Sequence, residues 1–151
     1  MDMRRVTRGV LLLVLAASIV GPGAVEAVDP TEAVRVTELV RATASWDGTP
    51  IRYPEGTPAV TAMIVEIIPG GETGWHEHPV PSFGYVSSGA IEVMLEDGRT
   101  RRFEEGEVVV EVVGRRHNGR NPGTVPARLV LFYAGDAATP VTIRDPAQAG
   151  G

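Results

Sequence analysis

Two histidines separated by a single residue are the side chains in this sequence best suited to chemistry. His76 and His78 lie in an extended run, and a pleated strand points alternate side chains to the same face. Two neighbouring imidazoles on a rigid strand provide half of a site for a divalent metal ion. The alternative is a pair of exposed strand histidines beside the acidic Glu77, since a histidine pair alone is a weak pattern.

The composition removes most other catalytic groups. The chain has 151 residues, no Cys, and 14 basic residues that are all Arg. The absence of Lys excludes Schiff-base and P-loop lysines, and the absence of Cys excludes thiolate nucleophiles, disulfides and Cys-based metal sites. The net charge of -5 argues against a nucleic acid as partner. His76, His78 and His117 are the only imidazoles available as metal ligands or bases.

The residues around the first two histidines resemble the first motif of the cupin family. Five residues separate Gly70 from His76, three separate His78 from Ser82, and six separate Ser82 from Gly89. Every spacing of the family motif is met. The departure is Ser82, which stands where the family has an acidic metal ligand.

The second cupin motif follows in the expected order. It is matched by Gly106, Gly114, His117 and Asn121, with Val112 in the place of the family's proline. The resemblance covers residues 60–134 and implies a small β-barrel of the jelly-roll type. It also implies that the three histidines together bind one divalent metal ion inside the barrel.

The resemblance implies a metal site with open positions. Three imidazoles suit Fe, Mn, Ni or Zn as cofactor and leave room for O2 or a small-molecule substrate. A hydroxyl is a poor metal ligand at neutral pH, so we expect Ser82 to contact a metal-bound water or ligand. Because the site lacks the acidic ligand, it carries one negative charge fewer, which favours an anionic substrate.

Glu111 is the first candidate catalytic residue, and two orientations are open. If it faces inward, its carboxylate lies near His117, where it can bind the metal, orient an imidazole or act as a base. If it faces outward it is solvated, and Val108, Val110 and Val112 face inward. A buried, unpaired carboxylate is costly, which counts against the inward orientation.

Tyr85 is the second candidate catalytic residue, as an aromatic side chain expected to line the pocket. Arg115, Arg116 and Arg120 flank His117. They either steer an anionic ligand or are simply solvated.

Short β-rich runs separated by turn residues are the elements that must position these side chains. The expected strands are 60–68, 73–78, 83–86, 91–95, 99–103, 108–113, 127–133 and 141–143. The clearest hairpin signal is Asp97-Gly98 between two of these runs. So many short strands without a helical period indicate an all-β sandwich or barrel, in agreement with a single cupin-type jelly-roll domain.

The first residues are typical of a signal peptide. Basic residues precede the apolar run 10–20, which is too short to cross a bilayer. We expect residues 1–27 to be removed by cleavage after Ala27, which predicts an exported protein, periplasmic or extracellular, without membrane attachment. The alternative is an uncleaved N-terminal anchor.

The mature chain is expected to have three parts. Residues 28–58 form an N-terminal arm, in which β-branched residues favour a strand over the helix that Asp29-Pro30 can open. Residues 59–145 form the barrel, and residues 146–151 form a flexible tail.

Two classes of function fit these features. The first is an exported metal-dependent enzyme, a dioxygenase-type oxidoreductase that acts on a small organic molecule at the three-histidine centre. The second is a non-catalytic module that holds a small molecule or the metal itself. Open coordination positions favour the enzyme, and the missing acidic ligand favours the module. Barrels of this size tend to associate through their sheets, so a homodimer is expected.

Overall fold

The protein is represented by a computed structural model that describes residues 33–144. The expected signal peptide, residues 1–27, and the expected tail, residues 146–151, lie outside the described residues. The chain divides into two units after residue 36, and the two sheets and the site described below belong to the second unit. No helix in residues 33–144 is long and apolar enough to cross a membrane.

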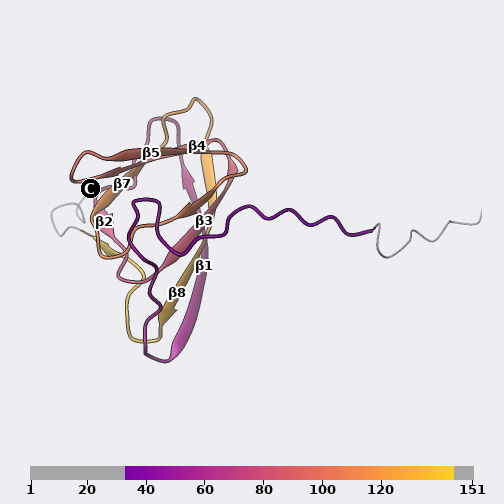
Figure 1. The fold of residues 1–151 in the computed structure, drawn as a ribbon. Coiled ribbons are helices and arrows are strands. Elements are labelled where there is room, and N and C mark those ends of the chain that lie inside the picture. The colour runs from indigo at the N-terminus through magenta and orange to yellow at the C-terminus, as the bar shows by residue number, and fades with distance from the viewer. Residues whose placement is uncertain (1–32, 145–151) are drawn as a thin grey trace, which may run out of the picture. The chain divides into compact units, whose positions relative to one another are not determined.

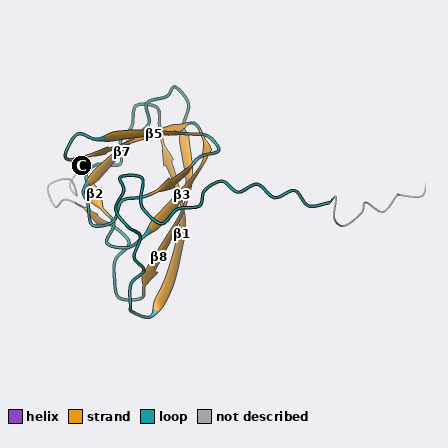
Figure 2. Ribbon diagram, in the orientation of Figure 1, coloured by secondary structure: helices purple, strands orange, loops and turns teal. Residues whose placement is uncertain are grey.

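Nine antiparallel strands in residues 33–144 form two sheets, which confirms the all-β jelly-roll expectation (Figures 1 and 2). One sheet has the order β1-β8-β3-β6, with the bounds Pro58–Ile67, Ala127–Asp136, Ser82–Ser88 and Val108–Val110. The other has the order β5-β4-β7-β2-β9, with the bounds Thr100–Glu104, Ala90–Leu95, His117–Arg120, His76–Glu77 and Ile143–Arg144.

The longest pairing, between β1 and β8, shows how the sequence pattern builds the core. The two strands pair from Pro58 opposite Asp136 to Ile67 opposite Ala127, and their side chains alternate between outer and inner faces as a pleated strand requires. Inward side chains from both sheets meet in one apolar core: Val86, Leu129, Leu131, Ile91, Val93 and Phe103.

The strands that carry the histidines are shorter than the sequence suggests. Only His76 and Glu77 of the run 73–78 form a strand, and the valine run ends as a strand at Val110. Strand β7 was not expected, because its sequence lacks β-branched residues. It forms because it is paired on both sides, with β4 at Leu95 and with β2 at His76.

The strand expected in the N-terminal arm is wrong for the described residues. Positions 33–57 form neither a strand nor a helix, and their one pairing is an isolated bridge between Ala44 and Pro50. The β-branched residues that favoured a strand, among them Val36, have no neighbouring strand to pair with and are exposed. Local β propensity does not produce a strand without a partner.

Candidate metal centre

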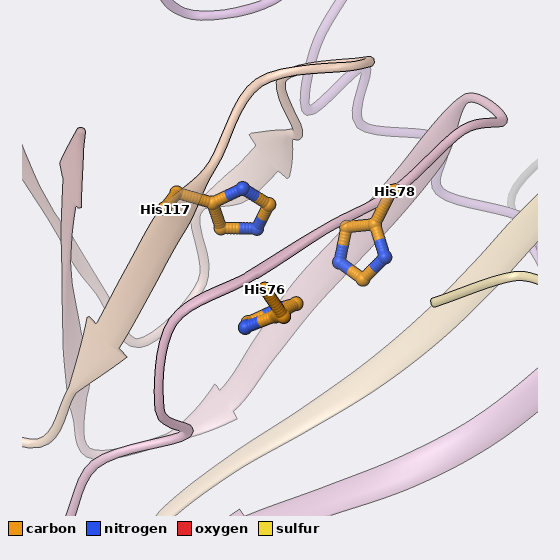
Figure 3. Close-up of side chains that lie close together, drawn as sticks. All are labelled: His76, His78 and His117. Atoms are coloured by element: carbon orange, nitrogen blue, oxygen red, sulfur yellow. The ribbon is translucent and has the colours of Figure 1, made fainter. Parts of the chain in front are cut away.

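The three histidines converge from two neighbouring strands. His76 on β2 pairs directly with His117 on β7, and His78 follows two residues after His76. The expectation that His76 and His78 share a face is confirmed, since one ring nitrogen from each of the three lies within 4.8 Å of the others. Figure 3 shows the three rings pointing toward one another. Their centroids are 4.4 to 5.0 Å apart.

Each imidazole is held in place by a backbone carbonyl on its Nδ1 side. Nδ1 of His76 lies 2.7 Å from the oxygen of Gly74, Nδ1 of His78 lies 2.8 Å from that of Val141, and Nδ1 of His117 lies 2.9 Å from that of Arg115. A carbonyl oxygen only accepts hydrogen bonds, so Nδ1 carries the hydrogen in all three rings. The lone pair is then on Nε2 in each ring, which is the tautomer that binds a metal ion.

The histidines are also in the charge state that metal binding requires. Burial lowers the pKa of His76 to about 4 and that of His78 to about 3. Burial lowers the pKa of His117 as well. At neutral pH all three rings are therefore neutral, and Nε2 of buried His117 has no hydrogen-bond partner in the described chain. Three converging, unprotonated nitrogens fit a divalent transition metal ion.

Glu111 faces inward, which resolves the alternative that the sequence left open. Its side chain is 6% exposed, and its Oε2 lies 3.8 Å from Nε2 of His117 without a hydrogen bond to the described residues. Burial raises the pKa of Glu111 to about 7. A carboxyl group with that pKa is poised to exchange a proton near neutral pH.

The segment at the end of β6 is covered on both faces. An alternating pattern of inward and outward side chains therefore does not describe it. Val110, Glu111 and Val112 are all buried. A loop of the N-terminal arm lies against this segment: Oγ of Ser45 donates to the carbonyl of Glu111 at 2.6 Å, and the Trp46 amide donates to that of Val110 at 3.0 Å.

A cavity of about 100 Å³ between the two sheets adjoins the histidines and Glu111. Most of its wall is aliphatic: Met63, Val65, Ile67, Ile91, Val93, Leu129 and Leu131. Thr73, Tyr133, Thr142 and Arg144 add polar groups to the lining. The metal nitrogens thus open onto a small space with an apolar part and a polar part.

Sequence reasoning did not assign Tyr133, Thr142 or Arg144 to the site. The ring of Tyr133 lies 5.2 Å from that of His78, and β9 brings Arg144 opposite His76. The signal for Tyr133 was present, as an inward position on a long strand. For Arg144 there was none, because the short strand that carries it lies beyond both motifs and its pairing partner is not written in the sequence.

Tyr85 does not line the cavity, so that expectation is wrong. Its side chain is 39% exposed, because Gly84 and Val86 occupy the inward positions of β3 and Tyr85 lies between them. Ser82 is buried but is also absent from the cavity lining, and its Oγ has no partner in residues 33–144. Nothing in its position supports the expected contact with a metal-bound water.

The arginines beside His117 do not line the cavity either. Arg115 donates to Asp47 at 2.8 Å and to Asp97 at 2.7 Å, and Asp97 also pairs with Arg99 at 2.9 Å. The Asp47 side chain is inaccessible to solvent. We call these four residues the clamp. The clamp fixes Arg115, whose carbonyl holds His117. Arg115 therefore positions a metal-binding histidine, and it does not steer an anion into the cavity.

Comparison with known proteins gives a family and a fold. Residues 63–133 match the cupin domain family. No curated protein matches the chain. A conserved protein with a double-stranded β-helix domain from Klebsiella pneumoniae has a similar structure, with a TM-score of 0.50, 22% identity, and coverage of 62% of this chain and 88% of that one. At that identity the likeness concerns the fold alone.

Two enzymes are among the other similar structures. The DMSP lyase DddQ of Ruegeria pomeroyi has a TM-score of 0.49 and 24% identity over 56% of this chain and 42% of its own. The oxalate decarboxylase of Lactobacillus farciminis has a TM-score of 0.49 and 28% identity over 56% of this chain and 26% of its own. The chain thus spans less than half of either enzyme.

The matched residues agree with the span of the two motifs, and they contain all three histidines and Glu111. The Klebsiella pneumoniae protein, which has a double-stranded β-helix domain, is similar in fold to the two sheets described above. Residues 63–133 therefore form a small domain of the cupin family.

Proposed function

We propose that this cupin domain is a metal-dependent enzyme that acts on a small organic molecule at the three-histidine centre. The observation that carries the proposal is the convergence of three Nε2 atoms with the buried, unpaired carboxyl of Glu111. A buried polar atom without a partner costs free energy, so the two that meet at this cavity, Nε2 of His117 and Oε2 of Glu111, need a reason. Binding a metal ion and a substrate supplies that reason.

The donor set defines what the site would hold. His76, His78 and His117 would bind one divalent ion, and neutral imidazoles suit Fe, Mn, Ni or Zn. A bound ion of this kind supplies a Lewis acid with open positions for O2 or an organic ligand. We propose oxygenase-like chemistry, in which substrate and O2 meet beside Glu111.

The chain's own residues would then have separate tasks. Glu111 would accept a proton from the substrate, since burial holds its pKa near 7. The aliphatic wall would exclude water and place the apolar part of the substrate. The carbonyls of Gly74, Val141 and Arg115 would keep the imidazoles oriented.

The deep burial of the histidines favours a second candidate, a module that holds a metal ion or small molecule without reaction. His76, His78 and His117 are 8%, 4% and 2% exposed, so a small metal complex would be well enclosed. In that case Glu111 would only balance charge.

Oxygen consumption separates the two candidates. The iron-loaded protein is given a panel of phenols, diketones and thiols, and O2 uptake is recorded against the Glu111→Gln variant. An enzyme consumes O2 with at least one substrate, and the variant is about 100-fold slower because it lacks the base. A flat panel with full iron loading contradicts the enzyme and supports the module.

We also propose that the chain is exported and forms a homodimer. The basic and apolar segments of residues 1–27 support export. Exposed apolar side chains on the outer face of the β1-β8-β3-β6 sheet, among them Val60, Ile64 and Phe132, support dimerisation through that sheet. Sedimentation of the mature protein tests the second point, and a monomer at micromolar concentration contradicts it.

A further inference from the structure

We propose that the cavity selects a small carboxylate with a short hydrocarbon body, and that Arg144 binds its carboxylate group. This inference rests on the proposed function, because it names the substrate class of the same site. It depends on three features of the described residues: the fixed position of Arg144, the charge that surrounds the cavity, and the shape and chemistry of the wall.

Arg144 is held at the edge of the cavity by two backbone interactions. The register of β9 on β2 places it opposite His76. One of its guanidinium nitrogens, Nη1, donates to the carbonyl of Thr73 at 3.1 Å. A guanidinium group has five N–H donors in a planar fork, so one bond to Thr73 leaves donors for a ligand.

No carboxylate among the described residues forms an ion pair with Arg144. The two acidic residues of the groove next to it, Glu66 and Glu72, have partners of their own. Glu66 lies 3.4 Å from Arg128, and Glu72 accepts from Asn118 at 2.7 Å. Within residues 33–144 the charge of Arg144 is therefore available to a ligand in the cavity.

The charge around the cavity is suited to an anion. Among the described residues that line it, Arg144 is the one permanently charged cation and Glu111 is the one acidic group. A divalent ion on the histidines would add two positive charges, so the site as a whole would attract negative charge.

The wall distinguishes a carboxylate from an inorganic anion. Seven aliphatic side chains line the cavity: Met63, Val65, Ile67, Ile91, Val93, Leu129 and Leu131. Phosphate or sulfate would leave this apolar surface without a partner, whereas a hydrocarbon body would cover it. Because a cavity of about 150 Å³ holds benzene, the 100 Å³ here is suited to a shorter body, of roughly three to five carbons.

Binding of butyrate, measured by calorimetry on the zinc-loaded and the metal-free protein, tests the inference. Butyramide serves as the neutral analogue of the same shape, and inorganic phosphate as the anion without a hydrocarbon body. We expect butyrate to bind at least about tenfold more tightly than either, because a charge-assisted fork of hydrogen bonds and an apolar wall act together.

The variant Arg144→Gln should lose at least about tenfold in butyrate affinity in both forms, and Arg144→Lys should recover part of the loss through its charge. Arg128→Gln is the matched control: Arg128 is another exposed strand arginine, and it does not line the cavity. Its butyrate affinity should equal that of the wild type. Zinc stoichiometry should be unchanged in all three variants.

Two results would overturn the inference: no butyrate binding by the wild type, or equal butyrate binding by wild type and Arg144→Gln. If zinc binds and butyrate behaves in either way, only the substrate class is wrong. If zinc does not bind, the proposed function fails, and the metal-free titrations still decide whether Arg144 binds a carboxylate.

Discussion

Two polar clusters, the cavity and the clamp, lie next to His117. Buried polar atoms are left unpaired in the cavity, whereas they are paired within the protein in the clamp. In the cavity, Nε2 of His117 and Oε2 of Glu111 have no hydrogen-bond partner within the described structure. In the clamp, the buried carboxylate of Asp47 accepts from Thr49 and Arg115. The carbonyl of Arg115 joins the two clusters, since it lies 2.9 Å from Nδ1 of His117.

We infer from this difference that the cavity binds a ligand and that the clamp supports the cavity. Leaving a buried polar atom unpaired costs about 1–3 kcal/mol, so a fold retains such atoms where a ligand will pair with them. The clamp uses its charges within the protein, and holds an N-terminal loop and the carbonyl behind His117. On this account the cavity gives the domain its chemistry, and the clamp gives the cavity its geometry.

Removing an imidazole should have the largest effect. His117→Ala deletes one of three converging nitrogens, and we expect metal affinity to fall by more than about 100-fold, beyond the loss typical of a supporting residue. Metal content after dialysis of the untagged protein measures this. Arg128→Gln is the control. Unchanged metal content in His117→Ala would mean that the ligands are misassigned.

Breaking the clamp should have an intermediate effect. Asp47→Ala leaves the Thr49 donors and one side of Arg115 without their partner, and we expect a loss of about 1–3 kcal/mol in the free energy of unfolding. If the clamp positions His117, metal affinity also falls about tenfold.

The control for the clamp is Glu66→Ala, which breaks the exposed ion pair with Arg128. Exposed pairs contribute at most about 1 kcal/mol, and metal affinity should not change. If Asp47→Ala lowers stability but leaves metal affinity at the wild-type value, the clamp supports the fold alone.

Glu111→Gln should stabilise the metal-free protein by an amount that depends on pH. Burial raises the folded-state pKa of Glu111 to about 7 from 4.5. A raised pKa contributes stability that is complete below pH 4.5 and is lost as the pH rises through 7. The wild type loses this stability and the Gln variant does not. Between pH 5 and pH 8 the metal-free variant should therefore gain about 2–3 kcal/mol over the wild type in the free energy of unfolding.

Denaturant unfolding at the two pH values measures that difference. The histidines are the same in both proteins, so their own titration cancels in the comparison. A stability difference that is independent of pH would show that Glu111 stays ionised or is solvated in the metal-free protein.

Tyr85→Phe should have the smallest effect. Tyr85 lies on the outer face of β3, between inward Gly84 and Val86, and its hydroxyl has no role at the cavity. Metal affinity and any activity should match the wild type within error. A clear loss of either would place Tyr85 in the site after all.

The sequence was sufficient for the histidines because their positions depend on local rules. His76 and His78 share a face through the period of a strand, and the turn glycines of the motifs set where the strands reverse. Gly114, with φ of 63°, is one such turn, and its amide donates to the carbonyl of His78 at 2.8 Å. This bond ties the two histidine-bearing segments together.

The rest of the site depends on long-range pairing, which the sequence does not record. Arg144 reaches the cavity because β9 pairs with β2. Glu111 faces inward because the loop at Ser45 and Trp46 covers the other side of its segment. Neither pairing partner could be identified from the local sequence pattern. The prediction of a strand in the N-terminal arm was wrong for the same reason.

Metal analysis of the untagged protein tests whether the three histidines form a metal site. The protein is purified, stripped, and reconstituted in turn with Fe, Mn, Ni and Zn, and bound metal is measured per chain. The three converging nitrogens predict one equivalent of at least one of these ions, lost in His117→Ala. Far less than one equivalent of every ion after reconstitution would contradict the account.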